Sequence, residues 1–254
     1  EKNSGKVRRV INGVLQASPV LDVPVNFDSE RGLLGIAING QSPPRVFLYY
    51  TENPASAGDN NSSTPLGNRI VRYSWNGSTL DSKQLILNLP ASPGPNHNGG
   101  FLLLGSPEPG LAGDGRPLYA VIGDLNRDNQ LENFSGAAAP DNTAVILRIQ
   151  QGDSASPDPL NPVFPYCSAS TGTTCTSNAN CPAGQTCMTQ VARYYAYGVR
   201  SSFGLAIDPV FDTLWDTDYL RALGMDEIAQ ELDEETKLTR QPDGEATPQE
   251  APAE

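Results

Sequence analysis

Short apolar segments broken by glycine and proline restrict the fold of this chain more than any other feature. Nine segments of 4 to 7 residues are rich in β-branched, leucine or aromatic residues and are bounded by Gly, Pro, Asn or Asp. No amphipathic helical pattern separates them, which argues against a parallel α/β sheet and favours an all-β fold. The predicted strands are 32–38, 45–51, 69–75, 84–89, 101–105, 117–122, 144–149, 191–197 and 204–207.

Several of these segments are apolar at consecutive positions, as in VFLYY at 46–50 and AVILRI at 144–149. A strand of this kind is buried on both faces, so it belongs to stacked sheets, either in a sandwich or in the blades of a propeller. Three long inserts interrupt the strands, at 53–68, 127–142 and 153–190. Inserts of this length usually carry function or lack order.

The negative charge of the chain is concentrated at its C-terminal end. Residues 1–215 hold 17 acidic residues against 14 Lys and Arg, a net charge of −3, whereas residues 216–254 hold 12 against 3, a net charge of −9. Neither part has the basic face that nucleic acid requires, so we expect no nucleic-acid partner. No apolar run approaches the ~18 residues of a membrane span.

The C-terminal end also has a different residue pattern. Leu220, Leu223, Ile228 and Leu232 recur at helical spacing among acidic residues, which predicts one short amphipathic helix. From Thr239 onward Pro, Glu, Ala and Gln dominate, which predicts a disordered tail. We therefore divide the chain into an all-β body at 1–217 and an acidic helix and tail at 218–254.

All four cysteines fall within one insert, between residues 167 and 187. None forms the C-x-x-C pair of a structural zinc site, and no histidine lies nearby. An even number of cysteines in a Ser-, Thr- and Gly-rich stretch favours two disulfides over zinc, and three pairings are open. Disulfides indicate an oxidising compartment, so we expect a secreted or periplasmic protein. The four residues are Cys167, Cys175, Cys181 and Cys187.

The only histidine lies in a turn of unusual composition, PGPNHNGG at 93–100. Prolines before His97 and glycines after it restrict the turn, and we expect the glycines to let a flat ligand approach the backbone. Histidine suits general-base chemistry near neutral pH. A solvated turn histidine without a catalytic role is the alternative on this feature alone.

Other motifs occur in a fixed order around this turn. ERGLLG begins at Glu30, VFLYYT follows, and LYAVIGD ends at Asp124 after the histidine turn. YGVRSSFGLA then surrounds Arg200, and TLWDT ends at Thr217. This succession resembles the glucose/sorbosone dehydrogenase family, the soluble sugar dehydrogenases that use pyrroloquinoline quinone (PQQ). The resemblance covers about residues 5–217, without the cysteine insert.

The resemblance implies a six-bladed β-propeller, of which this chain carries about the first half to two-thirds. It also implies that an aldose is oxidised at its anomeric carbon, with PQQ and Ca²⁺ as cofactors. His97 would take the proton of the anomeric hydroxyl, and Arg200 would lie beside the quinone carbonyl. Glu30, Asn96 and Gln130 match or lie near the positions of polar substrate contacts.

The sequence departs from the family pattern in two places. Ser201 stands where the family usually has Asn at the cofactor, so an amide is lost there. Tyr219-Leu220-Arg221 replaces the Gly-Pro turn whose carbonyls hold Ca²⁺ in the family, so the metal ligands are left unassigned. The segments with the Lys and Arg residues that neutralise the cofactor's carboxylates have no counterpart in the sequence, which leaves the activity of this truncated form open.

Two further interpretations stay open on the sequence. One is a non-catalytic extracellular propeller module that binds carbohydrate or protein, because a fold does not determine a function. The other is an unrelated lectin-like sandwich, which the strand pattern also permits. We expect a small-molecule sugar as ligand, and the sequence does not identify the electron acceptor. We also expect an open propeller edge that a partner chain could complete.

Overall fold

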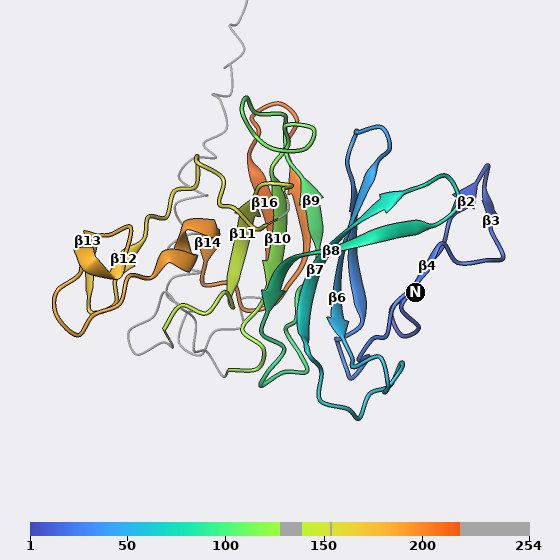
Figure 1. The fold of residues 1–254 in the computed structure, drawn as a ribbon, viewed down its shortest axis with the longest axis horizontal. Helices are drawn as coiled ribbons and strands as arrows, with labels where there is room; N and C mark the ends of the chain where they lie inside the picture. Colours follow the sequence, from blue (N-terminus) through green and yellow to red (C-terminus); the bar gives the residue numbers. More distant parts are fainter. Residues whose placement is uncertain (128–138, 153, 219–254) are drawn as a thin grey trace, which may run out of the picture. The chain divides into compact units, whose positions relative to one another are not determined.

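The computed structural model describes residues 1–127, 139–152 and 154–218. Contacts between residues divide the chain into two units, and all described residues lie in the first, Glu1–Tyr219. The predicted helix around Leu220–Leu232 and the predicted disordered tail lie outside the described residues. The described part is built from β-strands and two short 3₁₀ segments (Figure 1), as the sequence predicts for an all-β body.

The first large sheet contains four consecutive antiparallel strands. They are β5 (Leu33–Ile38), β6 (Arg45–Glu52), β7 (Gly67–Trp75) and β8 (Leu80–Leu89), in the order β5-β6-β7-β8. Each strand pairs with its neighbour in the sequence. Four of the predicted strands lie here, although the structure extends 84–89 forward to Leu80.

The second large sheet has the order β14-β11-β10-β9. Its strands are β9 (Leu102–Leu104), β10 (Leu118–Ile122), β11 (Val145–Ile149) and β14 (Tyr194–Tyr197). The strand predicted at 191–197 is therefore wrong in its first half. Thr189–Arg193 forms the 3₁₀ segment η2, and strand β14 begins only at Tyr194.

Shorter pairs of strands flank the two large sheets. All of these shorter strands except the one at Ser202–Ile207 were not predicted, because segments of two to five residues give too little periodicity. These shorter elements are β1 (Lys6–Val7), β4 (Leu21–Asp22), β2 (Val10–Ile11), β3 (Val14–Leu15), β12 (Tyr166–Cys167), β13 (Ser170–Thr174), η1 (Asn178–Asn180), β15 (Ser202–Ile207) and β16 (Leu214–Asp218). The pairs are β1 with β4, β2 with β3, β12 with β13, and β15 with β16.

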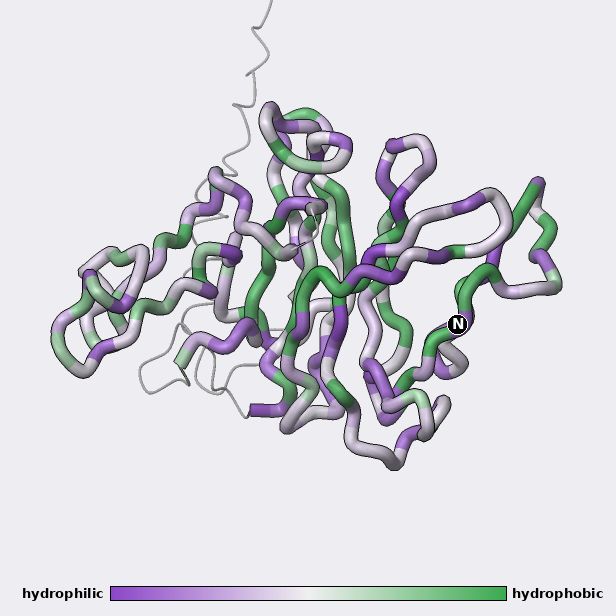
Figure 2. The backbone as a smooth tube through the Cα atoms, viewed as in Figure 1, coloured by the Kyte–Doolittle hydropathy of each residue, from purple (hydrophilic) through white to green (hydrophobic). Residues whose placement is uncertain are grey.

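The two large sheets pack face to face and both are buried on their other faces as well. Phe47 and Tyr49 of β6 point to the same side of the first sheet and share one core cluster with Leu118 and Ala120 of β10. Figure 2 shows the central strands as mainly hydrophobic segments. The interface between the sheets is thus the centre of the core.

The outer faces of the two sheets are covered by different parts of the chain. Leu48 and Tyr50 pack with Val7 and Val20 of the N-terminal segment. On the other side, Val121 of the second sheet packs with Leu205 of β15 and with Leu214 of β16. The result is a stack of sheets in which successive four-stranded units follow one another, as the blades of a propeller do. A two-sheet sandwich has one buried face per sheet, so the lectin-like interpretation is wrong.

The far side of the β15–β16 pair is exposed. Phe203 and Trp215 are 65% and 64% exposed, and Val210 and Phe211 in the connecting turn are 77% and 78% exposed. Isolated exposed apolar residues are common, but four on one strand pair form a patch that usually contacts something else.

The cysteine insert contains the two predicted disulfides. Cys167 pairs with Cys181 and Cys175 pairs with Cys187, closing loops with sequence separations of 14 and 12 residues. The four sulfur-bearing residues form a small cluster of their own. The described residues contain no free cysteine. The described part of the chain also contains no helix long and apolar enough to cross a membrane.

Candidate functional site

The histidine turn is fixed by close contacts between backbones. His97 has a φ of +58°, and Gly99 and Gly100 have φ values of +61° and +97°. A Cβ atom at Gly99 would lie 2.6 Å from the carbonyl oxygen of Val121, and one at Gly100 would lie 2.5 Å from the Cβ of Leu34. Glycine is required here because the turn packs closely on neighbouring strands, and the approach of a flat ligand to these glycines stays a prediction.

The imidazole of His97 is oriented by a buried carboxylate. Its Nδ1 atom lies 2.6 Å from Oδ1 of Asp124, and the two side chains are 14% and 1% exposed. Asp124 lies two residues after the end of β10, and its Oδ1 also accepts a hydrogen bond from the backbone N–H of Asn126 at 3.1 Å. A carboxylate at Nδ1 favours the tautomer in which Nδ1 carries the proton, which leaves Nε2 as an acceptor.

Glu30 contacts the backbone of the same histidine. A carboxylate oxygen of Glu30 accepts a hydrogen bond from the N–H of His97. His97 has a positive φ, which is uncommon for a residue with a side chain, so this hydrogen bond stabilises an otherwise unfavourable conformation. The structure therefore places Glu30, predicted as a substrate contact, against the catalytic candidate itself.

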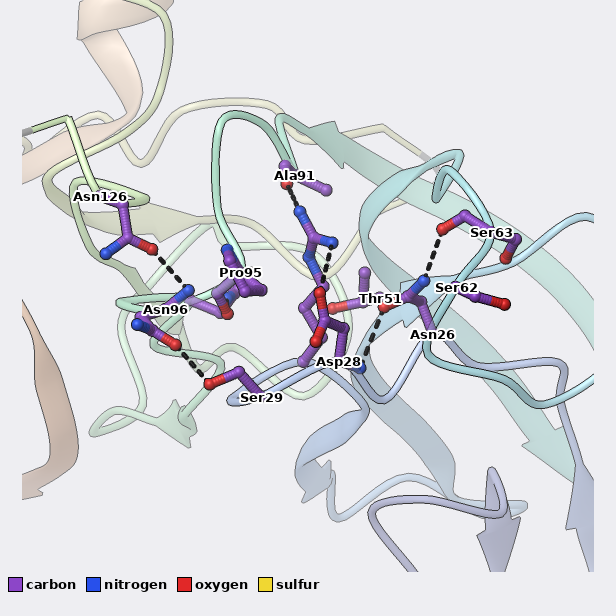
Figure 3. Close-up of polar contacts among 12 residues, drawn as sticks. Asn26, Asp28, Ser29, Thr51, Ser62, Ser63, Ala91, Pro95, Asn96 and Asn126 are labelled. Carbon is purple, nitrogen blue, oxygen red and sulfur yellow. Dashed lines mark hydrogen bonds and ion pairs between the residues drawn. The ribbon is translucent and has the colours of Figure 1, made fainter.

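Asn96 is linked to two neighbouring loops (Figure 3). Its backbone N–H donates to Oδ1 of Asn126 at 2.7 Å, and its side-chain oxygen accepts a hydrogen bond from the hydroxyl of Ser29. The loops that carry Glu30, His97 and Asp124 are thereby tied to one another. The side chain of Asn96 is partly exposed, so it lies at the margin of the site rather than beneath it.

Arg31 and Tyr49 make a second set of contacts around the histidine turn. The guanidinium of Arg31 donates to the carbonyl of Ala91 and lies 3.9 Å from Asp28 (Figure 3). Burial lowers the pKa of Arg31, and the charge of Asp28 works against that shift. The hydroxyl of Tyr49 donates to the carbonyl of Asn98 at 3.1 Å, and burial raises the pKa of this tyrosine. These contacts hold the turn rather than offering groups to a ligand.

Arg200 joins the site through its backbone. Its carbonyl accepts a hydrogen bond from the N–H of Asp124 at 3.0 Å. A Cβ atom at Gly123 would lie 2.3 Å from this carbonyl and 2.5 Å from that of His97, so Gly123 lies between the two segments. Ser201 is 3% exposed and Arg200 is partly exposed. The structure thus brings Arg200 and Ser201 to the loops of His97 and Asp124.

The remaining predicted residues are Gln130 and the four cysteines. Gln130 lies outside the described residues. Among the described residues, the one group of side chains with metal-ligating spacing is Cys167, Cys175 and Cys181, and all three are in disulfides. One residue of the site was not predicted, namely Asp124, although it was visible as the acidic residue that follows the apolar LYAVI strand. A carboxylate within two residues of the end of a buried strand is a signal that could have identified Asp124.

The second carboxylate oxygen of Asp124 is buried and has no hydrogen-bond partner among the described residues. A buried charged oxygen without a partner costs free energy, so the pairing with His97 and with the N–H of Asn126 must offset this cost. Buried polar atoms without a hydrogen-bond partner are often found at functional sites.

Sequence comparison and structure comparison give different results for this chain. No family model matches the sequence, and no curated protein matches it. Solved structures do match the fold. A putative oxidoreductase described as a glucose dehydrogenase from Thermus thermophilus has a TM-score of 0.58 and 23% identity, and the match covers 84% of this chain and 52% of its own.

Two other structures titled glucose dehydrogenase agree with the first. One has a TM-score of 0.58 at 17% identity and covers 84% of this chain and 55% of its own. The other has a TM-score of 0.57 at 16% identity and covers 86% of this chain and 52% of its own. These matches confirm the predicted resemblance at the level of the fold. The chain spans about half the length of the structures that it matches.

Proposed function

We propose that this chain is part of a sugar oxidoreductase that oxidises an aldose at its anomeric carbon with PQQ, and that His97 is the general base. The observation that carries the proposal is the contact between Nδ1 of His97 and the buried carboxylate of Asp124. A base needs a fixed orientation and a free acceptor atom, and this pair supplies both. The shared fold with glucose dehydrogenase structures supports the substrate class.

The residues of the chain have separate roles in the proposed reaction. Nε2 of His97 takes the proton of the anomeric hydroxyl as the C–H bond of that carbon breaks, and the aldose becomes a lactone. Asp124 stabilises the imidazolium that forms. Glu30 holds the backbone of His97 and Asn96 holds the loops around it. When bound, PQQ supplies the two-electron acceptor for the hydride.

Two described residues are candidates for contacts with one end of the proposed cofactor. The backbone carbonyl of Arg200 accepts the N–H of Asp124, so Arg200 belongs to the loops of the candidate site, and its guanidinium is the cation proposed to stabilise negative charge on a reduced quinone oxygen. Ser201 follows it with a short buried hydroxyl side chain. We therefore propose Arg200 and Ser201 as cofactor contacts, with Arg200 acting on the reacting end of PQQ.

The described residues do not support a Ca²⁺ site in the same way. The described residues form no group of carboxylate ligands at this site, and the segment expected to hold Ca²⁺ continues beyond Asp218. No step is assigned to the metal. Calcium stays a prediction that follows from the resemblance alone.

Two further proposals concern the cellular location of the protein and a segment that packs against it. The two disulfides support a secreted or periplasmic location, because such bonds persist in oxidising compartments. The exposed patch at Phe203 and Trp215 supports a partner segment that packs on β15–β16 as a further blade. An electron acceptor is required by the chemistry, and its identity is not proposed.

The function is tested with purified protein supplied with PQQ and Ca²⁺, by following the sugar-dependent reduction of a dye. We expect reduction with at least one aldose, a rise in melting temperature with PQQ, and loss of reduction in His97→Ala without loss of folding. Absence of both turnover and a PQQ-dependent thermal shift would favour the alternative, a non-catalytic binding propeller. Activity that persists in His97→Ala would remove His97 as the base.

A further inference from the structure

A groove lies between the disulfide-linked insert and the outermost strand of the second sheet. Its volume is about 510 Å³, which is within the usual range of small-ligand sites. Figure 1 shows the β12–β13 hairpin beside β14 on the outer side of this sheet. The groove is lined by Pro140, Pro162, Val163, Phe164, Tyr166, Thr171, Thr174, Val191, Tyr194 and Tyr197.

Phe164 is held in an exposed position on the wall of this groove. It is 68% exposed, and it lies in the sequence Pro162-Val163-Phe164-Pro165. Proline fixes its own φ and restricts the residue before it, so the two prolines stiffen this segment. The carbonyl of Pro165 also accepts a hydrogen bond from the N–H of Cys175 at 3.1 Å. An exposed aromatic ring on a stiffened backbone segment is suited to contact a ligand, because less backbone entropy is lost on binding.

The chemistry of the lining is aromatic and hydroxylic. Phe164 and Tyr197 contribute exposed aromatic rings, and Thr171 and Thr174 contribute hydroxyls. None of the lining residues is Asp, Glu, Lys or Arg. A neutral ligand with apolar C–H faces and many hydroxyls matches this lining, because aromatic faces are electron-rich and hydroxyls both donate and accept.

The second sheet links the strand that lines the groove to the strand that precedes the candidate site. Tyr197 pairs with Val145, and Val145 pairs with Ile122, the residue directly before Gly123-Asp124. Two strand spacings of about 4.8 Å separate β10 from β14, a total of about 10 Å. Arg127 adds a second link, because it lies 2.5 Å from the carboxylate of Asp141, next to the lining residue Pro140.

We propose that this groove binds sugar units of a neutral oligosaccharide whose reducing end lies at His97. The inference rests on the proposed function, and it narrows the substrate class from a monosaccharide to a saccharide chain. The cysteine insert then serves as a wall of the binding site, and its two disulfides keep that wall in place without a large apolar core.

Binding is measured by isothermal titration calorimetry without PQQ, so that the result does not depend on turnover. The probes are cellohexaose, maltohexaose and glucose. We expect at least one hexasaccharide to bind at least about 10-fold more tightly than glucose, and Phe164→Ala to weaken that binding by about 10-fold. Tyr197→Phe, which removes only a hydroxyl, should weaken it by a smaller factor.

Phe211→Ala is the matched control, because Phe211 is 78% exposed in the β15–β16 turn and lies outside the groove lining. It should bind hexasaccharide like the original chain. The inference is overturned if neither hexasaccharide binds more tightly than glucose, or if Phe164→Ala and Phe211→Ala bind equally well. Hexasaccharide binding without any dye reduction would instead retain the groove and remove the proposed oxidoreductase function.

Discussion

The Nδ1 atom of His97 lies 2.6 Å from Oδ1 of Asp124, and the carboxylate is almost completely buried while the imidazole remains partly exposed. One side of the ring is thus fixed by the protein and the other side is left for a ligand. Asp124 follows β10 and His97 belongs to the turn before β9, so the pair connects the ends of two neighbouring strands. The orientation of the imidazole is thus set by the second sheet.

Asp124→Asn should reduce sugar-dependent dye reduction by roughly 10³- to 10⁴-fold, because an amide no longer favours the tautomer with a free Nε2. Folding should be retained, since the amide oxygen can still accept the N–H of Asn126. Asp208→Asn is the matched control, because Asp208 also accepts a backbone N–H two residues ahead, that of Val210 at 2.8 Å. Equal activities in the two variants would argue against an orienting role for Asp124.

Glu30→Ala should lower kcat by about 10²-fold, because the backbone of His97 would lose its carboxylate acceptor and the imidazole would shift. Glu30→Gln keeps an oxygen acceptor and should restore most of the activity. A substrate contact would behave differently, because its loss would raise KM more than it lowers kcat. Steady-state kinetics of the two variants distinguish the positioning role from a direct contact.

The disulfide pairing has a direct chemical test. Peptide mapping without reductant should link Cys167 to Cys181 and Cys175 to Cys187, and full reduction should add about 4 Da to the intact mass. Replacement of Cys175 and Cys187 by serine should destabilise the insert by about 2–3 kcal/mol and expose it to protease. Peptides that join Cys167 to Cys175 or to Cys187 would contradict the structure.

Asp114 should make stability depend on pH in acid. Burial works to raise its pKa, but hydrogen bonds from Arg116, the N–H of Gly40 and Gln151 outweigh that effect and lower the pKa to about 2. A lowered pKa in the folded state gives stability that is present above the unfolded value of 3.8 and is lost as the pH falls towards 2.

Urea unfolding between about pH 5 and pH 2 measures this effect. Asp114→Asn should lower stability near neutral pH and should flatten the decline in acid. Asp22→Asn is the control, because Asp22 is exposed in β4 and its side chain makes no hydrogen bond with other described residues. A decline in Asp114→Asn as steep as in the original chain would assign the acid sensitivity to other groups.

The sequence predicted the large sheets well because their strands carry long apolar runs. VFLYY and LYAVI are buried on both sides, and their β-branched and aromatic residues favour a strand over a helix. Val191–Arg193 was assigned wrongly because a single apolar residue before the YYAY strand continues the β-type pattern, whereas tertiary contacts hold it as a 3₁₀ segment. The two-residue strands near the N-terminus are too short to show the alternation of apolar and polar residues that identifies a strand.

The site was predictable only in part. His97 and Arg200 were chosen as candidates from the order of motifs, whereas Asp124 is identified by a contact between residues that are 27 positions apart. Glu30 was found with a different role, because its hydrogen bond to a backbone N–H depends on a turn geometry that the sequence does not specify. The disulfide pairing was open for the same reason, since cysteine spacing permits three arrangements.

His97 is the only histidine of the chain, so a single measurement reports on the orientation of the proposed base. In ¹⁵N NMR of histidine-labelled protein at about pH 8, where an unperturbed imidazole is neutral, the two ring nitrogens give distinct signals for each tautomer. We expect a protonated Nδ1 and an unprotonated Nε2, and loss of this preference in Asp124→Asn. A protonated Nε2, or equal mixing of the two tautomers in the original chain, would refute the proposed orientation of His97 by Asp124.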